Sequence, residues 1–334
     1  MFRKILIANR GEIAVRIIRA ARELGIATVA VYSTADKEAL HTLLADEAIC
    51  IGPGKATESY LNINAILSAA VLTEAEAIHP GFGFLSENSK FATMCDEVGI
   101  KFIGPSGAVM DTMGDKINAR EQMIKAGVPV IPGSDGEVHT AEEALAVAEK
   151  IGYPVMLKAS AGGGGKGIRK VEKAEDLVAA FETASSEAKA NFGNGAMYLE
   201  RVIYPARHIE VQILADQEGH VVHLGERDCS LQRNNQKVLE ESPSIAIGKT
   251  LRHEIGAAAV RAAESVGYEN AGTIEFLLDE ASGNFYFMEM NTRVQVEHPV
   301  TEFVSGVDIV KEQIRIAAGQ PLPFKQEDIV LRGH

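Results

Sequence analysis

Apolar residues over the first 103 positions fall into two alternating patterns. Short runs of consecutive apolar residues predict buried strands, and apolar residues at a spacing of three and four predict helices between them. The expected strands are at 4–8, 28–32, 48–51, 75–78 and 101–103, and the expected helices are near 13–24, 62–72 and 86–98. This alternation predicts a parallel sheet with helices on both faces. Ligands of such sheets bind at the carboxyl ends of the strands, where segments 9–11 and 79–83 are expected.

The regular alternation of strands and helices ends beyond a helix expected at 116–126. A turn-rich stretch at 130–136 is typical of a domain junction. From 140 to 203 the pattern predicts a small α+β lobe, and strands resume after Pro205. The strands expected in this part are 154–159, 167–171, 197–203, 208–215, 220–225, 272–278 and 284–290, and the helices are near 174–190, 250–266 and 307–317. The chain is therefore expected to be an α/β protein of two or three domains.

Composition narrows the class of protein. The chain has 334 residues, of which 46% are hydrophobic and 24% charged, and this excludes a disordered or collagen-like chain. A formal net charge of −13 argues against nonspecific binding to nucleic acid or to an anionic membrane. No apolar run approaches the ~20 residues of a membrane-spanning helix, and the N-terminus lacks a secretory signal pattern. Cysteines without metal-ligand spacing favour free thiols and a cytoplasmic location.

A glycine run at 160–167 is the sharpest local feature. Its spacing satisfies G-x-G-x-x-G, but a dinucleotide-binding turn needs a helix directly after it, and the residues that follow are typical of a strand. Strand, glycine turn and strand predict a hairpin whose tip folds over an anion, because glycine backbone approaches phosphates closely. Lys158 and Lys166 supply positive charge there. The alternative is a flexible loop without a ligand.

Two acidic residues in apolar strands predict a metal site. Glu275 precedes Phe276 to Leu278, and Glu289 lies between two methionines. A carboxylate inside an apolar strand is costly unless it is paired or binds metal. Asn291 shares a strand face with Glu289, so two carboxylates and an amide offer hard oxygen ligands suited to Mg²⁺ or Mn²⁺ bound together with phosphates. The alternative is an edge strand with solvated acids.

Polar and apolar residues continue to alternate from 291 to 299. A continuing strand would place Arg293, Gln295 and Glu297 on the face that carries Asn291. Arginine grips a planar anion with two parallel hydrogen bonds, and glutamate acts as a general base. These three residues therefore predict a catalytic strand face, and His298 is interpreted as structural.

Several motifs occur together and in order, at 9–14, 79–88, 114–116, 160–167, 225–230 and 289–299. In this set the chain resembles the biotin carboxylase family of ATP-grasp enzymes, and most of all the biotin carboxylase subunits of bacterial acetyl-CoA carboxylases. The resemblance covers the whole chain. It implies a Rossmann-like pre-ATP-grasp domain at 1–114 and an ATP-grasp region at 115–334, with 131–203 as a mobile lid and 204–334 as a partial C-terminal domain. The family's chain continues beyond His334, so the C-terminal domain is expected to be incomplete.

The resemblance also implies a reaction. Bicarbonate attacks the γ-phosphate of ATP to give carboxyphosphate, which decays to CO₂, and the ureido nitrogen of biotin captures the CO₂. The substrate is biotin on biotin carboxyl carrier protein, and the reaction is the first half-reaction of acetyl-CoA carboxylase in fatty acid (malonyl-CoA) synthesis. ATP and two Mg²⁺ or Mn²⁺ ions are the implied cofactors. The implied partners are the carrier protein and the carboxyltransferase subunits, and family members are typically homodimers.

The site residues that the resemblance implies fall into four groups. The ATP-binding residues are Lys116, Lys158, Gly164, Gly165, Glu200, Arg201, Val202, Ile203, His208, Gln232, Asn235, Glu275 and Glu289. The metal ligands are Glu275, Glu289 and Asn291. The bicarbonate-binding residues are Lys237, Arg293, Gln295 and Val296. The catalytic residues are Arg293, Glu297 and Lys237, with Glu297 as the base that deprotonates bicarbonate. Some relatives carry His at the position of Asn235, which can bind a sugar hydroxyl but carries no charge.

Four alternatives remain open at this point. The first alternative is a nucleotide-binding fragment without turnover, and the second is the biotin carboxylase part of another biotin-dependent carboxylase. The third is another ATP-grasp ligase, and the fourth is a dinucleotide-dependent oxidoreductase. The oxidoreductase is the weakest, because Ala8 to Glu12 after the first strand contains no glycine fingerprint.

Overall fold

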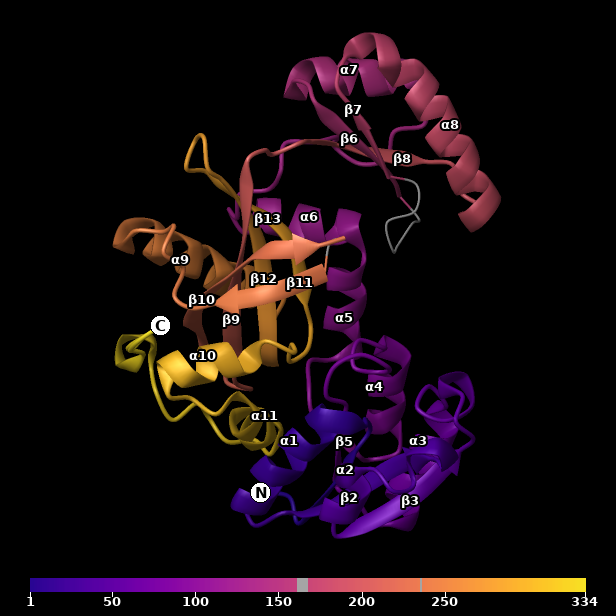
Figure 1. Ribbon diagram of the computed structural model, residues 1–334, viewed down its shortest axis with the longest axis vertical. Helices are drawn as coiled ribbons and strands as arrows, with labels where there is room; N and C mark the ends of the chain where they lie inside the picture. Colours follow the sequence, from indigo (N-terminus) through magenta and orange to yellow (C-terminus); the bar gives the residue numbers. More distant parts are fainter. Residues whose placement is uncertain (161–167, 235) are drawn as a thin grey trace. The chain divides into compact units, whose positions relative to one another are not determined.

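The computed structural model describes residues 1–160, 168–234 and 236–334 (Figure 1). Gly164, Gly165 and Asn235 of the expected ATP site, with most of the glycine run, lie outside the described residues. The chain forms two compact units. The first contains Met1–Val128, His208–Phe276 and Glu289–His334, and the second contains Pro129–Arg207 and Leu277–Met288.

The N-terminal part of the first unit is a five-stranded parallel sheet in the order β3-β2-β1-β4-β5. Its strands are β1 (Lys4–Ile7), β2 (Ala27–Ser33), β3 (Glu47–Gly52), β4 (Ala77–His79) and β5 (Lys101–Phe102). Its helices are α1 (Gly11–Glu23), α2 (Leu40–Leu44), α3 (Ile63–Leu72) and α4 (Ser89–Glu97), with short 3₁₀ turns at Thr34–Asp36 and Ala56–Glu58. The predicted parallel sheet is confirmed, and only the short helix α2 was not expected.

Both faces of this sheet are covered, as the sequence pattern predicts. Ile5 and Ile7 pack in one apolar cluster with α1, whereas Leu6 packs in another with α3 and α4. Successive residues of a strand point to opposite faces, so a fully apolar strand needs cover on each side.

The loops that follow β1 and β4 are tied to each other. The Asn9 amide donates hydrogen bonds to the carbonyl oxygens of Pro80 and Phe82, at 2.7 and 2.8 Å. Gly81 lies between them with φ of +64°, and a Cβ atom there would meet Asn9 and Ile13 at 3.0 Å. Glycine is therefore required at this close approach.

The second part of the first unit is built on a sheet in the order β11-β10-β9-β12-β13. Its strands are β9 (Ala206–Ala215), β10 (Val221–Arg233), β11 (Gln236–Glu241), β12 (Asn270–Asp279) and β13 (Phe285–Asn291). Its helices are α5 (Gly107–Gly114), α6 (Lys116–Lys125), α9 (Lys249–Ser265), α10 (His298–Ser305) and α11 (Ile309–Ala317), with a 3₁₀ turn at Gln326–Asp328. The strand expected to end at 225 continues to Arg233 and pairs with β11, which was not predicted.

The second unit is the small α+β lobe that the pattern predicts. Its sheet has the order β7-β6-β8, with β6 antiparallel to both neighbours. The elements are α7 (Ala141–Ile151), β6 (Val155–Ala159), β7 (Ile168–Val171), α8 (Ala174–Phe192) and β8 (Met197–Arg201). Leu157, Phe181 and Leu199 are buried in its core.

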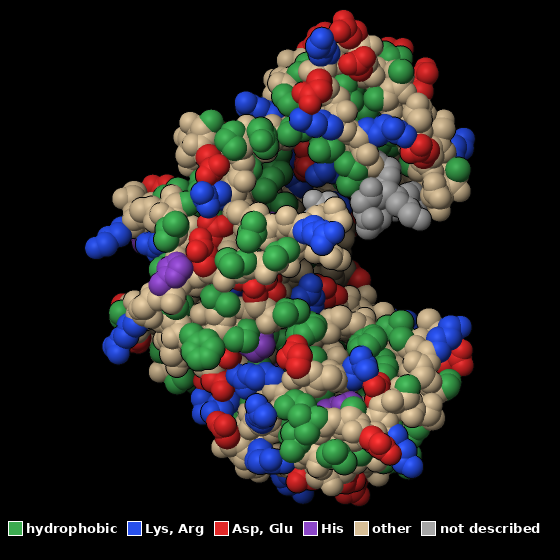
Figure 2. Space-filling model, in the orientation of Figure 1, with side chains coloured by type: hydrophobic (Ala, Val, Ile, Leu, Met, Phe, Trp, Pro, Cys, Tyr) green, Lys and Arg blue, Asp and Glu red, His purple; other side chains and the backbone are tan. Residues whose placement is uncertain are grey.

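Charged side chains of both signs are spread over the surface in Figure 2. Lys and Arg side chains are interspersed with Asp and Glu on the face that Figure 2 shows. Among the described residues, no helix is both long and apolar enough to cross a membrane.

Candidate active site

Lys237 on β11 is surrounded by three carboxylates of the first unit. Its amine donates hydrogen bonds to Glu210 on β9, to Glu275 on β12 at 3.0 Å and to Glu297 before α10 at 2.6 Å. Burial opposes the charged form of the amine, but Glu210 and Glu275 outweigh burial and raise the pKa of Lys237 well above its usual value. Lys237 is therefore a permanent cation in a cluster with excess negative charge.

His208 on β9 extends this cluster. Its Nε2 lies 3.0 Å from Glu275 Oε2 and 3.7 Å from Glu210 Oε2. Burial lowers the pKa of His208, but the two carboxylates outweigh burial and raise it to about 9. The Gln232 amide lies 3.2 Å from the other ring nitrogen, so two expected ATP-binding residues contact each other.

The expected metal ligands lie on neighbouring strands. Glu275 is buried, and its Oε1 accepts a hydrogen bond of 2.9 Å from the Asn291 amide. Glu289 is exposed, yet the surrounding protein raises the pKa of its carboxyl group, and the charge of Glu275 raises it further. Two carboxylates, one of which raises the pKa of the other, fit a divalent cation with hard oxygen ligands. Glu210, which was not predicted, also has a ligand atom within 4.8 Å of those of His208 and Glu275.

Arg293 lies beside Asn291 with its guanidinium held on two sides. It donates to Glu87 Oε2 at 2.8 Å and to Asn291 Oδ1 at 2.8 Å. Glu87 also accepts a hydrogen bond of 3.0 Å from the backbone N–H of Thr292. Glu87 was part of a quoted motif, but no role was predicted for it.

The prediction of a continuous strand face from 289 to 297 is wrong. Strand β13 ends at Asn291, and helix α10 begins at His298 with a proline in its first turn. The residues between them are irregular, and Gln295 is buried whereas Val296 is 60% exposed. The backbone path of this segment, rather than strand alternation, brings Gln295 Nε2 to 2.9 Å from Glu275 Oε1.

Arg227 on β10 is the largest fully buried side chain among the described residues. It lies opposite Glu210 in the antiparallel ladder, and its Nε donates to Glu210 Oε1 at 2.5 Å. Its Nη2 donates to Gln295 Oε1 at 2.7 Å. No role was predicted for Arg227, although it lies in the motif at 225–230. Glu210 was also not predicted, although it lies between two apolar residues of its strand, which is the signal that identified Glu275.

In the second unit, Lys158 on β6 donates a hydrogen bond to Glu200 on β8. Strand β8 ends at Arg201, and the N–H of Val202 donates to the carbonyl of Pro154 at 2.9 Å. Two of the expected ATP-binding residues are thus an ion pair on adjacent strands. Glu200 and Arg201 of the expected segment 200–203 pair with Met156 and Val155 of β6. Lys116, the first residue of α6, belongs to the first unit. Its charge lowers the pKa of Glu289, but desolvation by the surrounding protein and the charge of Glu275 outweigh it.

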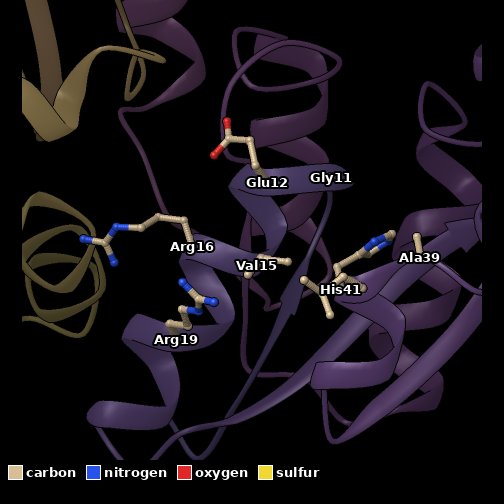
Figure 3. Close-up of a pocket in the computed structure, with 8 residues that line it drawn as sticks. Gly11, Glu12, Val15, Arg16, Arg19, Ala39 and His41 are labelled. Atoms are coloured by element: carbon tan, nitrogen blue, oxygen red, sulfur yellow. The ribbon is translucent and has the colours of Figure 1, made fainter.

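A separate pocket lies on α1 and α2 (Figure 3). Its volume is about 480 Å³, and Arg16 and Arg19 of α1 are among the residues that line it. Arg16 is paired with Glu302 and Asp308 at 3.0 and 2.6 Å. The eight described residues that line this pocket include none of the expected site residues.

Two family models match the chain. The model described as the biotin carboxylase N-terminal domain matches residues 1–110, and the ATP-binding domain of the carbamoyl-phosphate synthase L chain matches 115–325. Biotin carboxylase of Nostoc sp. is 60% identical over 333 residues, which are 100% of this chain and 74% of the relative.

Solved structures of biotin carboxylases are also similar to this chain. The Campylobacter jejuni biotin carboxylase structure is 54% identical with a TM-score of 0.93, and the match covers 100% of this chain and 74% of that chain. The biotin carboxylase domain of Hydrogenobacter thermophilus 2-oxoglutarate carboxylase, in complex with MgADP, ADP and bicarbonate, is 55% identical with a TM-score of 0.91, over 100% and 73% of the two chains. This chain belongs to the biotin carboxylase family, whose members are ATP-dependent ligases with an ATP-grasp fold.

Proposed function

We propose that this chain carboxylates biotin on biotin carboxyl carrier protein, with bicarbonate and MgATP as substrates and carboxyphosphate as the intermediate. The observation that carries the proposal is the cluster around Lys237, whose amine lies 2.6 Å from Glu297 and 3.0 Å from Glu275. This cluster joins a candidate base to a candidate metal ligand through one fixed cation. Such an arrangement serves a reaction in which an anion loses a proton next to bound phosphates.

Bicarbonate is an anion, so its site needs cations close to the base. Lys237 and Arg293 supply them, and Gln295 and the backbone at Val296 complete the proposed bicarbonate site. Arg293 has five N–H donors, and its contacts with Glu87 and Asn291 fix the plane in which the remaining donors point. Its side chain is 21% exposed, which leaves access for a small anion.

Glu297 accepts the proton of bicarbonate in this proposal. The released oxygen electrons attack the γ-phosphorus, and the bond to the ADP oxygen breaks. Glu275, Glu289 and Asn291 hold Mg²⁺ or Mn²⁺, which, when bound, neutralises charge on the phosphates. Lys237 stabilises Glu297 and the bicarbonate oxygens together.

For the nucleotide, we propose the ATP-binding residues that the family resemblance implies. Lys116, His208 and Gln232 belong to the first unit, and Lys158 and segment 200–203 belong to the second. Gly164, Gly165 and Asn235 complete the proposed ATP set. Within the second unit, the ion pair between Lys158 and Glu200 supports this proposal, because it fixes a lysine amine close to segment 200–203. The segment 131–203 is proposed to act as a lid over ATP. We also propose a Rossmann-like pre-ATP-grasp domain at 1–114 and an ATP-grasp region at 115–334, with a partial C-terminal domain at 204–334.

The acceptor is proposed to be the carrier protein of an acetyl-CoA carboxylase, which acts in fatty acid synthesis with carboxyltransferase subunits. The choice rests on the resemblance of the ordered motifs to the biotin carboxylase subunits of bacterial acetyl-CoA carboxylases. The relative from Hydrogenobacter belongs to a 2-oxoglutarate carboxylase, so a carrier from such an enzyme is the competing acceptor. A homodimer and a cytoplasmic location stay predictions.

ADP release tests the proposal. We expect release that needs bicarbonate and increases when biotin is added. MgATP binding without biotin-stimulated release would instead support a nucleotide-binding protein without turnover. Comparison of purified carrier domains from acetyl-CoA and 2-oxoglutarate carboxylases then identifies the acceptor, because the correct domain is carboxylated at the lower concentration.

A further inference from the structure

All three nitrogens of the Arg227 guanidinium donate hydrogen bonds within the first unit. Its side chain is 0% exposed. A guanidinium has five N–H donors, and five side-chain oxygens lie within hydrogen-bonding distance. These oxygens are Glu210 Oε1 at 2.5 Å, Gln212 Oε1 and Thr301 Oγ1 at 2.9 Å, Thr273 Oγ1 at 3.3 Å and Gln295 Oε1 at 2.7 Å.

A buried network of hydrogen bonds around a charged side chain adds little to the stability of a fold. Burying a charged pair costs desolvation energy, and apolar residues of the same volume often serve a core equally well. Lysine could balance the charge of Glu210, but it has three donors on a single atom. Only arginine reaches two other strands, a loop and helix α10 at once, so the geometry indicates a role in orientation.

The first group that Arg227 orients is the Gln295 carboxamide. Because Nη2 of Arg227 donates to Gln295 Oε1, the oxygen of the amide must face Arg227. The Nε2 group must then face Glu275, where it lies 2.9 Å from Oε1. The second group is Glu210. Its Oε1 is occupied by Arg227, so its Oε2 is left for Lys237.

We propose that Arg227 is a positioning residue for bicarbonate, which acts by fixing the direction of the Gln295 amide and of the Glu210 carboxylate on Lys237. This inference rests on the proposed function, because Gln295 and Lys237 belong to the proposed bicarbonate site. Arg227 itself does not touch substrate. It sets which atoms of the site face the anion.

The test compares two conservative arginine variants in the full chain. Arg227→Lys keeps the charge but loses the five-donor fork. Arg252→Lys is the matched control, because Arg252 on α9 makes a similar contact with Glu226 on the same strand as Arg227, at 2.8 Å, outside the site. For Arg227→Lys we expect the KM for bicarbonate to rise about ten- to hundredfold with little change in the KM for ATP. For Arg252→Lys we expect both values to stay within about twofold. Equal rises of both KM values, or no rise, would overturn the proposal.

A second measurement does not depend on turnover. The Gln295 side-chain amide, assigned in the NMR spectrum by its loss in Gln295→Leu, is expected to exchange slowly with solvent in the unsubstituted protein. Rapid exchange, or a resonance that Arg227→Lys leaves unmoved, would overturn the role of Arg227. Absence of bicarbonate-dependent ADP release from the unsubstituted protein would instead overturn the proposed function, so the two failures are distinct.

Discussion

The amine of Lys237 lies 2.6 Å from Glu297 Oε1, within a single hydrogen bond. Glu297 precedes α10 and Lys237 lies on β11, so the contact joins parts of the chain that are 60 residues apart. The cation that balances the candidate base also contacts Glu275, a candidate metal ligand, at 3.0 Å. Loss of this amine would disturb the base and the metal site together.

Replacing Lys237 by glutamine is expected to lower kcat/KM for bicarbonate by about a hundredfold or more, because a fixed charge at the reacting anion is removed. Steady-state ADP release at varied bicarbonate measures the effect. The exposed Lys249→Gln is the control and is expected to behave as the unsubstituted protein. Activity of Lys237→Gln within threefold of normal would show that the amine is not part of the bicarbonate site.

Replacing Glu289 by glutamine is expected to abolish ATP turnover at low Mg²⁺, since a charged oxygen ligand becomes a neutral amide. Titration of ADP release with Mg²⁺ should show a higher metal requirement. The exposed Glu254→Gln on α9 serves as the control. Near-normal activity of Glu289→Gln at low Mg²⁺ would contradict the metal assignment.

Closure of the proposed lid predicts a change in protease sensitivity. MgATP should protect cleavage sites within 131–203, because a lid that covers a nucleotide is less often open. Limited proteolysis followed by mass spectrometry locates the sites. The same cleavage rate with and without MgATP would count against a lid.

Two buried histidines predict a loss of stability in mild acid. Burial lowers the pKa of His79 to about 3 and that of His298 to about 4, whereas an unfolded histidine titrates near about 6.5. Below pH 6.5 the unfolded chain therefore binds more protons than the folded chain, so the free energy of unfolding falls as the pH falls. Each histidine is expected to cost about 2 kcal/mol between pH 6.5 and 5.

Urea unfolding at pH 7 and pH 5 measures this loss. His298→Gln should reduce the dependence on pH, and the exposed His253→Gln should leave it unchanged. Equal dependence in all three proteins would show that His298 does not titrate in the way its burial indicates.

The sequence pattern predicted the parallel sheet because its inner strands are short apolar runs, as in β1, where Ile5 and Ile7 are buried on one face and Leu6 on the other. It failed at β11 and α10 for different reasons. Val238 and Leu239 of β11 are exposed, so apolar side chains in this strand do not mark a buried face. The alternation up to 299 resembled a strand, although Pro299 in the first turn of α10 is typical of a helix start.

The candidate site was predicted from motifs, yet its buried support was missed. Glu210 and Arg227 are opposite each other only because β9 and β10 pair in one particular register. Hydrophobic spacing within a single strand contains no information about that register. The contact between Glu87 and Arg293 joins residues 206 positions apart. The spacing of residues within one segment could not predict this contact either.

Transfer of label from isotopic bicarbonate to biotin tests the central claim most directly. We expect labelled carboxybiotin in a one-to-one ratio with the ADP whose release depends on biotin, and loss of both products in Glu297→Gln. ADP release without label on biotin, or undiminished labelling by Glu297→Gln, would contradict it.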